Sequence, residues 1–209
     1  MTRIERGSIA ADVAARENQV LGTGPRIVPV PTDAVPESAW DLARGIRAAN
    51  GGKPPKVMSA HLRTMLKHAD LFRCQLEQAT ALYAGRLPPR ERELAILRIG
   101  WLAQAPYEWG EHVLIGKRHG LGPEEVARVR EGSQASNWTE HDAAILAGAE
   151  ELLGNYALHD ATWDTLAKTY DELQMIEFLV VVGQYAATAM LQNSLRIQLS
   201  DANCGLRQE

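Results

Sequence analysis

The chain contains few cysteines and no block of like charges. Its 209 residues include two cysteines, Cys74 and Cys204, which are far apart in the sequence and form no CxxC pair. This count excludes a disulfide framework and leaves no spacing typical of a zinc site, so we expect a reducing, cytoplasmic location. Lysine and arginine are scattered and the formal net charge is −4. We therefore expect no nucleic-acid partner.

The sequence also lacks a convincing export or membrane-spanning segment. Its N-terminal stretch carries acidic residues and no continuous apolar run, which argues against a signal peptide. The longest uncharged run, Phe178 to Leu195, approaches the about 20 residues that a spanning helix needs. Because it contains Gln184, Gln192 and Asn193, it is too polar for a lipid-facing helix. We expect a helix buried in the core or at a subunit contact, and no membrane partner.

Signals for helix starts recur along the chain, whereas no segment alternates polar and apolar residues as a strand does. Prolines at first helical positions, and Ser, Thr or Asp residues at N-cap positions (Ser59, Asp70, Thr139 and Asp160), indicate where helices begin. The expected helices are 37–49, 60–68, 71–83, three that begin at Pro89, Pro106 and Pro123, one over 140–154, one after Asp160, and one over 172–199. Short connections between about eight helices predict an all-α fold, a compact multi-helix bundle.

The first 36 residues differ from the remainder. They contain Pro25, Pro29, Pro31 and Pro36 and show no helical period. We therefore expect an irregular N-terminal arm over 1–36, followed by a single all-α domain over 37–209.

An acid and an imidazole lie four residues apart after Pro106. On a helix that begins there, Glu108 and His112 share one face with Ile115 and His119. The Glu108 carboxylate can then contact the His112 ring, which fixes one tautomer and raises the pKa of the imidazole. Such a pair suits proton transfer near neutral pH. A second acid, Glu93, opens the preceding helix, in which Arg98 is the one charged residue from 94 to 107.

Structural explanations exist for each of these residues. A Glu–His pair at this spacing is most often a solvated surface pair. Tyr107 and Trp109 are more often packing residues, and Arg98 more often pairs with a structural acid than with a substrate. Glu108, His112 and His119 have no HExxH motif or further ligand cluster beside them, so we expect no metal. The remaining histidines are interpreted as surface or capping residues; they are His61, His68, His141 and His159.

Several of these features occur in a recognisable order. Glu93 opens a buried helix, the segment Tyr107-Glu108-Trp109-x-x-His112 follows, and a Gly-Leu-Gly turn at 120–122 precedes Glu-Glu-Val. Over about 57–131 the chain resembles the carboxymuconolactone decarboxylase/alkylhydroperoxidase D-like superfamily, and 170–195 is similar to the second half of longer members. The resemblance implies the alkylhydroperoxidase D-like bundle and assembly into homotrimers or homohexamers.

The sequence departs from that family at the positions of its redox thiols. Members that act as thiol peroxidases carry a CxxC just before the histidine, and here the two thiol positions hold Ala105 and Glu108. Sulfur redox chemistry needs a thiolate to attack the peroxide and a partner to resolve the product. Thiol peroxidase activity is therefore disfavoured.

The resemblance instead implies a cofactor-free lyase of the carboxymuconolactone decarboxylase type, acting on a small cyclic or conjugated carboxylic acid. His112 would donate the proton, Glu108 would orient it, and Glu93 would be a supporting carboxylate or an acid in its own right. The expected substrate-binding residues are Arg98, Tyr107, Trp109 and Tyr185. No cofactor and no metal are expected.

Two alternatives stay open. The chain is either another acid–base enzyme, such as an isomerase or hydratase, or a non-catalytic binding or assembly protein in which the Glu108–His112 pair joins helices. Burial distinguishes them, because a catalytic His112 should lie beside a cavity with apolar walls, whereas a structural one should face the solvent.

Overall fold

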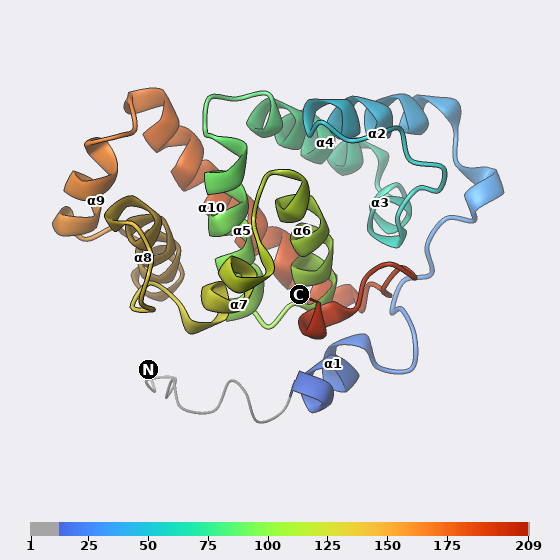
Figure 1. Cartoon of the computed structure of the whole chain (residues 1–209). Helices are drawn as coiled ribbons and strands as arrows, with labels where there is room; N and C mark the ends of the chain where they lie inside the picture. The colour runs from blue at the N-terminus through green and yellow to red at the C-terminus, as the bar shows by residue number, and fades with distance from the viewer. Residues whose placement is uncertain (1–12, 209) are drawn as a thin grey trace.

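The computed structural model describes residues 13–208, which form helices and no strand (Figure 1). The all-α prediction is confirmed. The α-helices are α1 (Val13–Leu21), α2 (Glu37–Ala49), α3 (Ala60–Met65), α4 (Ala69–Tyr83), α5 (Pro89–Leu102), α6 (Pro106–Arg118), α7 (Pro123–Glu131), α8 (Glu140–Asn155), α9 (Asp160–Ala167) and α10 (Glu172–Leu195). Two short 3₁₀ helices lie at Thr32–Ala34 and Gly205–Arg207.

Local sequence explains where most helices begin. Proline occupies the first helical position of α5, α6 and α7, where no backbone N–H is needed. The side chains of Ser59 and Thr139 accept hydrogen bonds from N–H groups in the first turns of α3 and α8. Two predicted caps were wrong. His68 caps α4 in place of Asp70, and the N-cap residue of α9 is His159, one residue before Asp160.

The last long helix is shorter than predicted. It ends at Leu195 instead of 199 because Arg196 adopts a left-handed conformation, with φ of 55°. This conformation reverses the chain and lets the Ile197 N–H donate to the Gln192 carbonyl.

We predicted that the N-terminal arm, residues 1–36, is irregular, but part of it is helical. Its residues 1–12 lie outside the described residues, but Val13–Leu21 forms α1, which precedes all four prolines. The buried Glu17 carboxylate accepts a hydrogen bond of 2.7 Å from the Leu206 N–H, and Arg16 donates to the carbonyls of Ala103 and Gln104. Tertiary contacts with the C-terminal 3₁₀ helix therefore hold a helix that its own sequence predicts weakly.

Two apolar clusters form the interior. The larger one surrounds α5, which lies at the centre of Figure 1 and contacts α6, α7, α8 and α10. Every residue of α5 from Arg92 to Trp101 is buried, which explains why Arg98 is the one charged residue between Leu94 and Trp101. The smaller cluster joins α2, α3 and α4, and α2 and α4 lie side by side at the upper right of Figure 1. The candidate site lies between the two clusters.

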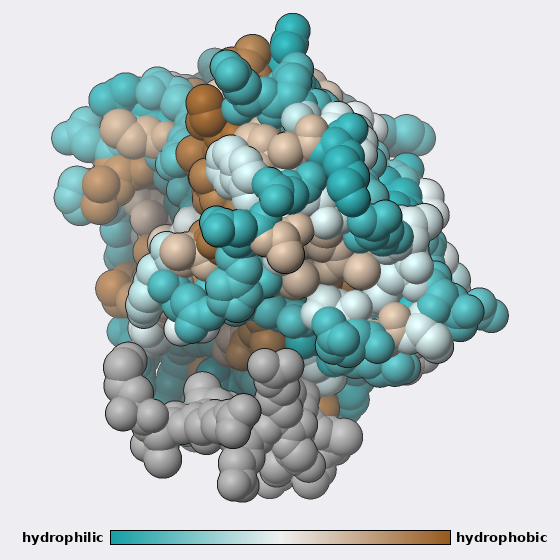
Figure 2. Space-filling model, turned by 90° about the vertical axis from the view of Figure 1, so that its left-hand side faces the viewer, coloured by the Kyte–Doolittle hydropathy of each residue, from teal (hydrophilic) through white to brown (hydrophobic). Residues whose placement is uncertain are grey.

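One helix among the described residues, α10, is long and apolar enough to span a membrane by length and composition. Its inner face contributes Phe178, Val181, Val182 and Tyr185 to the larger cluster. The helix therefore belongs to the core, and no membrane protein is indicated. Its outer face carries exposed apolar residues, and Figure 2 shows such brown residues interspersed on a largely hydrophilic side of the molecule.

Candidate functional site

A cavity of about 190 Å³ lies between the two apolar clusters. Residues of α2, α3, α4, α6 and α10 line it, together with the loop after α2. An apolar cavity of about 150 Å³ holds a benzene molecule, so this one is large enough for a single substituted ring. Of the predicted site residues, Tyr107, Glu108, His112 and Tyr185 line the cavity.

The imidazole of His112 is held from behind by a residue of α5. Its Nδ1 lies 2.7 Å from Oε2 of Glu93, and the His112 and Glu93 side chains are 7% and 0% exposed. Arg92 Nε donates to the other carboxylate oxygen of Glu93 at 3.3 Å. The Tyr185 ring packs edge-on against the imidazole, with the centroids 4.9 Å apart. These contacts fix the ring, so that Nε2 is directed away from Glu93.

Glu108 lies on the other side of the ring. Its Oε1 is 3.6 Å from His112 Nε2, which is an ion-pair distance but too long for a hydrogen bond. Oε1 is buried and has no hydrogen-bond partner, whereas the carboxyl group is hydrogen-bonded by the side chain of Gln192. The predicted role of Glu108 in orienting His112 stays a prediction, and its contact with the ring is an ion-pair contact. Glu93 hydrogen-bonds Nδ1 of the ring, Glu108 lies beside Nε2, and His112 and Glu108 both line the cavity.

Burial and charge act in opposite directions on this group of residues. Burial opposes the charging of His112 and is the largest single effect on its pKa, but attraction to Glu93, the Glu93 hydrogen bond and attraction to Glu108 together raise that pKa. For Glu108, burial raises the pKa, and the nearby His112 and the Gln192 hydrogen bond only partly oppose it. Both residues next to the cavity therefore hold a proton more tightly than they would in water.

Two tyrosines form a second polar feature of the cavity. The hydroxyls of Tyr83 and Tyr185 lie 2.6 Å apart and are buried. Burial raises the pKa of both phenols, so both stay neutral and one hydroxyl hydrogen remains free to donate outside the pair. The guanidinium of Arg92 lies 4.4 Å from the centroid of the Tyr83 ring. Tyr83 was not predicted as a site residue, because it closes an ordinary amphipathic helix and carries no motif.

His61 was predicted as a surface or capping residue, and this prediction is wrong. It is 8% exposed and lines the cavity from α3. Burial lowers the pKa of His61 to about 4, so the ring is neutral at pH 7, and its Nδ1 has no hydrogen-bond partner. The neighbouring Tyr107 hydroxyl is held by Ser59 and by the backbone of His61. Only the packing of α3 onto α6 reveals this residue.

Two predicted substrate-binding residues do not reach the cavity. Arg98 Nε pairs with Glu150 at 2.9 Å, and its Nη1 donates to the carbonyls of Val129 and Arg130. Trp109 is fully buried, and its Nε1 donates to the Gln208 carbonyl at 3.0 Å. Neither side chain reaches the cavity, because each lies on a different helix face from its neighbour in the candidate site: five residues separate Arg98 from Glu93, about 140° around the helix.

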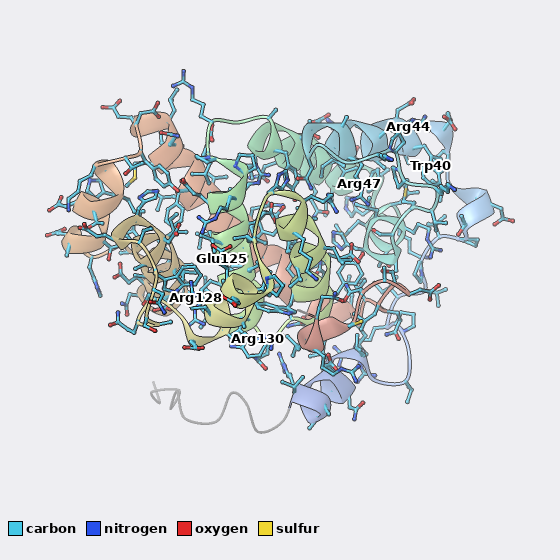
Figure 3. All side chains as sticks on the ribbon, viewed as in Figure 1. Trp40, Arg44, Arg47, Glu125, Arg128 and Arg130 are labelled. Atoms are coloured by element: carbon cyan, nitrogen blue, oxygen red, sulfur yellow. The ribbon has the colours of Figure 1, made fainter. Side chains whose placement is uncertain are left out.

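The rim of the cavity contains charged and polar residues. Arg47 projects from α2 (Figure 3) and lines the cavity, as does Glu111 of α6. Burial, followed by repulsion from Arg47, lowers the pKa of the nearby Arg118. His119 Nε2 lies 2.9 Å from the side-chain oxygen of Asn50, which connects the end of α6 to the end of α2. The rim therefore carries charges of both signs, with Arg47 on α2 and Glu111 on α6.

The cysteines are not part of the cavity lining. Cys74 and Cys204 are free and exposed, and neither lines the cavity. Within residues 13–208, no three histidine, cysteine, aspartate or glutamate side chains are placed to hold a metal ion.

Comparison with known proteins places the fold. The carboxymuconolactone decarboxylase family matches residues 70–151, and no curated protein matches the chain. The crystal structure of the apo debrominase Bmp8 superposes with a TM-score of 0.68 and 21% identity, covering 85% of this chain and 93% of Bmp8.

Two further solved structures are similar. An uncharacterized peroxidase-related protein from Ralstonia eutropha JMP134 with an alkylhydroperoxidase AhpD core has a TM-score of 0.69 and 16% identity, over 84% of this chain and 93% of its own. A protein of unknown function from Agrobacterium tumefaciens has a TM-score of 0.61 and 15% identity, over 65% of this chain and 94% of its own. Residues 70–151 thus match the carboxymuconolactone decarboxylase family, and the chain shares the all-helical fold of these alkylhydroperoxidase D-like structures.

Proposed function

We propose that the protein is a cofactor-free acid–base enzyme, a lyase of the decarboxylase type, in which His112 transfers a proton to a carbon atom of a small cyclic or conjugated carboxylic acid. The observation that supports this most directly is the buried series Glu93–His112–Glu108, which ends on a cavity of the size of one ring. A solvated surface pair has neither this burial nor a second carboxylate behind the imidazole.

The arrangement suits a proton donor. Glu93 balances the charge of a protonated His112, so the acid can exist away from water. Glu108 has an unpaired oxygen near Nε2 and a raised pKa, and it can share or resupply the proton. In the reaction, the bond between carbon and the carboxylate breaks, its electron pair moves into the conjugated carbonyl, and CO2 leaves. The enolate carbon then takes the proton, which solvent returns to the enzyme.

The two tyrosines fit the charge that develops in this step. A conjugated carbonyl that accepts the electron pair becomes an oxyanion, and neutral hydroxyl donors in a buried site stabilise it. The Tyr83–Tyr185 pair offers one free O–H into the same cavity. This supports an enolate-forming reaction and makes no use of sulfur.

The function is tested by incubating a panel of cyclic and conjugated acids with the enzyme in D2O. We expect one deuteron on the product carbon for each CO2 released. His112→Asn should lose activity by a factor of about 100 or more, since general acid catalysis contributes about that much. The matched control is His141→Asn, because His141 also pairs with a glutamate of α5, Glu91, but lies outside the cavity.

The outcomes separate the alternatives. Deuterium incorporation without CO2 release would indicate an isomerase or hydratase. An enzyme that performs neither step on any acid of the panel would favour a binding protein, and full activity of His112→Asn would contradict the proposed acid.

We also propose that the chain assembles with copies of itself through α10. The exposed positions of this helix after Glu172 alternate in spacing by three and four residues, and all are uncharged: Leu173, Ile176, Val180, Gly183, Ala187, Met190 and Ser194. This is the spacing of a helix–helix seam. An exposed apolar stripe of this length marks an interface.

A second copy fits this stripe well. Related by a two-fold axis, two α10 helices would cross near Gly183, around which there is open space, and Val180 of one copy would meet the small Ala187 of the other. The absence of charge from the stripe allows it to pair with itself. A cytoplasmic location, in which the exposed Cys74 and Cys204 stay reduced, is consistent with this proposal.

A further inference from the structure

Four buried polar atoms without hydrogen-bond partners belong to residues that line this cavity. They are His61 Nδ1, Gln75 Oε1, Glu108 Oε1 and Gln192 Oε1, and they come from α3, α4, α6 and α10. Folded proteins leave few buried polar atoms unpaired. The four atoms come from four different helices that meet at this cavity. Because none of them has a hydrogen-bond partner within the protein, they indicate where a polar ligand binds.

The chemical character of these atoms restricts the ligand. Gln192 Oε1 is buried beside the Glu108 carboxyl group and has no hydrogen-bond partner. The Gln192 oxygen is therefore left to accept from something else. The Gln75 oxygen is likewise an acceptor, and Glu108 Oε1 accepts whenever that carboxyl is ionised. The wall formed by Gln75, Glu108 and Gln192 thus offers hydrogen-bond acceptors, and the basic group next to it is His112, whose Nε2 lies 3.6 Å from Glu108 Oε1.

The rim differs from this wall because it carries a cation as well as an acid, Glu111 of α6. Arg47 lines the cavity from α2, with Arg118 near it. An anionic group placed at the inner wall would meet the Glu108 carboxyl group and two amide oxygens, whereas at the rim it would meet Arg47. Charge therefore favours one orientation of a ligand that carries both kinds of group.

We infer that the substrate is a ring bearing at least two O–H or N–H donors, which face the inner wall of Gln75, Glu108 and Gln192, and that any carboxylate it carries lies at the rim beside Arg47. This deepens the proposed function by naming the substrate class, and it rests on that function only in placing the reacting carbon near His112. It excludes substrates whose polar groups are carboxylates alone.

Binding of small probes tests the inference without knowledge of the reaction. Catechol and resorcinol carry two donors on a ring, toluene carries none, and benzoate carries an anion. We expect at least one of the two diols to bind at least tenfold more tightly than toluene or benzoate, as measured by NMR titration of the cavity side chains. Tighter binding of toluene or benzoate, or no binding of either diol at millimolar concentration, would overturn the inference.

Variants of the two glutamines test which side chains accept hydrogen bonds from the ligand. Gln192→Leu and Gln75→Leu should each weaken binding of the preferred diol about threefold to tenfold, the worth of one hydrogen bond, and should leave toluene unaffected. Gln78→Leu is the matched control, because Gln78 lies on the same helix, is exposed, and does not line this cavity. Unchanged diol binding in both cavity variants would contradict the assigned wall. The comparison of probes on the unaltered protein stands even if a variant fails to fold.

The test also separates this inference from the proposed function. His112→Asn should keep the preference for diols, since His112 is not one of the acceptors. If the preference is found but His112→Asn keeps full turnover, the acid–base function fails and the ligand class stands. If His112→Asn loses turnover while benzoate binds more tightly than the diols, the ligand class fails and the function stands.

Discussion

Glu93 and His112 are 19 residues apart in the sequence, yet their side chains meet at 2.7 Å across the contact between α5 and α6. Both helices begin at a proline, and the connection between them is short, so they lie against each other. The backbone of Trp109 lies beside Gly100, where α5 has no side chain. Tertiary packing consequently supplies the hydrogen bond to the imidazole, in addition to the ion-pair contact with its helical neighbour Glu108.

Glu93→Gln should lower the pKa of His112. The substitution removes the attraction and the charged hydrogen bond that together overcome burial, and leaves burial acting alone with the weaker effect of Glu108. We expect the pKa of His112 to fall, as measured by NMR titration of the imidazole. Glu91→Gln, on the same helix and paired with His141, should leave the His112 titration unchanged. Equal titration of the His112 ring in both variants would show that Glu93 does not control it.

Removing the guanidinium of Arg98 should lower the stability of the fold and leave binding of ligands in the cavity unchanged. Arg98 is 7% exposed in its side chain, and its loss leaves the Glu150 carboxylate without its ion-pair partner. We expect Arg98→Ala to lower the free energy of unfolding by about 3 kcal/mol in urea titrations, the range for a broken buried pair, while the affinity for the cavity probes stays the same. Arg73→Ala, which breaks an exposed pair with Glu77, should change stability little. Weakened probe binding by folded Arg98→Ala would restore a role in the site.

Protonation of His61 should destabilise the fold in acid. The pKa of His61 is lowered to about 4, so between pH 6.5 and 4 the unfolded chain binds a proton that the folded chain does not. Stability from neutral His61 is therefore present above pH 6.5 and is lost as the pH falls to about 4, by roughly 3 kcal/mol in total. The measurement is the difference in unfolding free energy between the natural chain and His61→Gln across this range. Parallel curves would mean that His61 is not buried in solution.

Charges placed on the outer face of α10 should abolish self-association. Val180→Lys combined with Ala187→Lys puts like charges at the expected crossing point of two copies, where they repel and lose hydration. Sedimentation equilibrium should show a monomer, with the helical circular dichroism unchanged. Val28→Lys, at an apolar residue that is 70% exposed elsewhere, is the control and should leave the assembly intact. An unaltered mass for the double variant would place the interface on another surface.

The positions at which helices begin depend largely on residues close together in the chain, so they can be predicted from the sequence. Proline at the first position of α5, α6 and α7 and the threonine cap of α8 act within one turn of chain. The two ends that were predicted poorly, α1 and the end of α10, depend on other contacts. α1 is held by the C-terminal segment, and α10 ends where Arg196 turns the chain back.

The same distinction between local sequence and tertiary packing applies to the candidate site. The sequence by itself determined that Glu108 and His112 share a helix face, because that follows from 3.6 residues per turn. Only the tertiary structure decided that Glu93 holds the imidazole, that Arg98 and Trp109 face elsewhere, and that His61, Tyr83 and Gln192 meet at one cavity. The physical reason is that a helix has several faces of similar composition, and which face meets which neighbour depends on the packing of residues far apart in the chain.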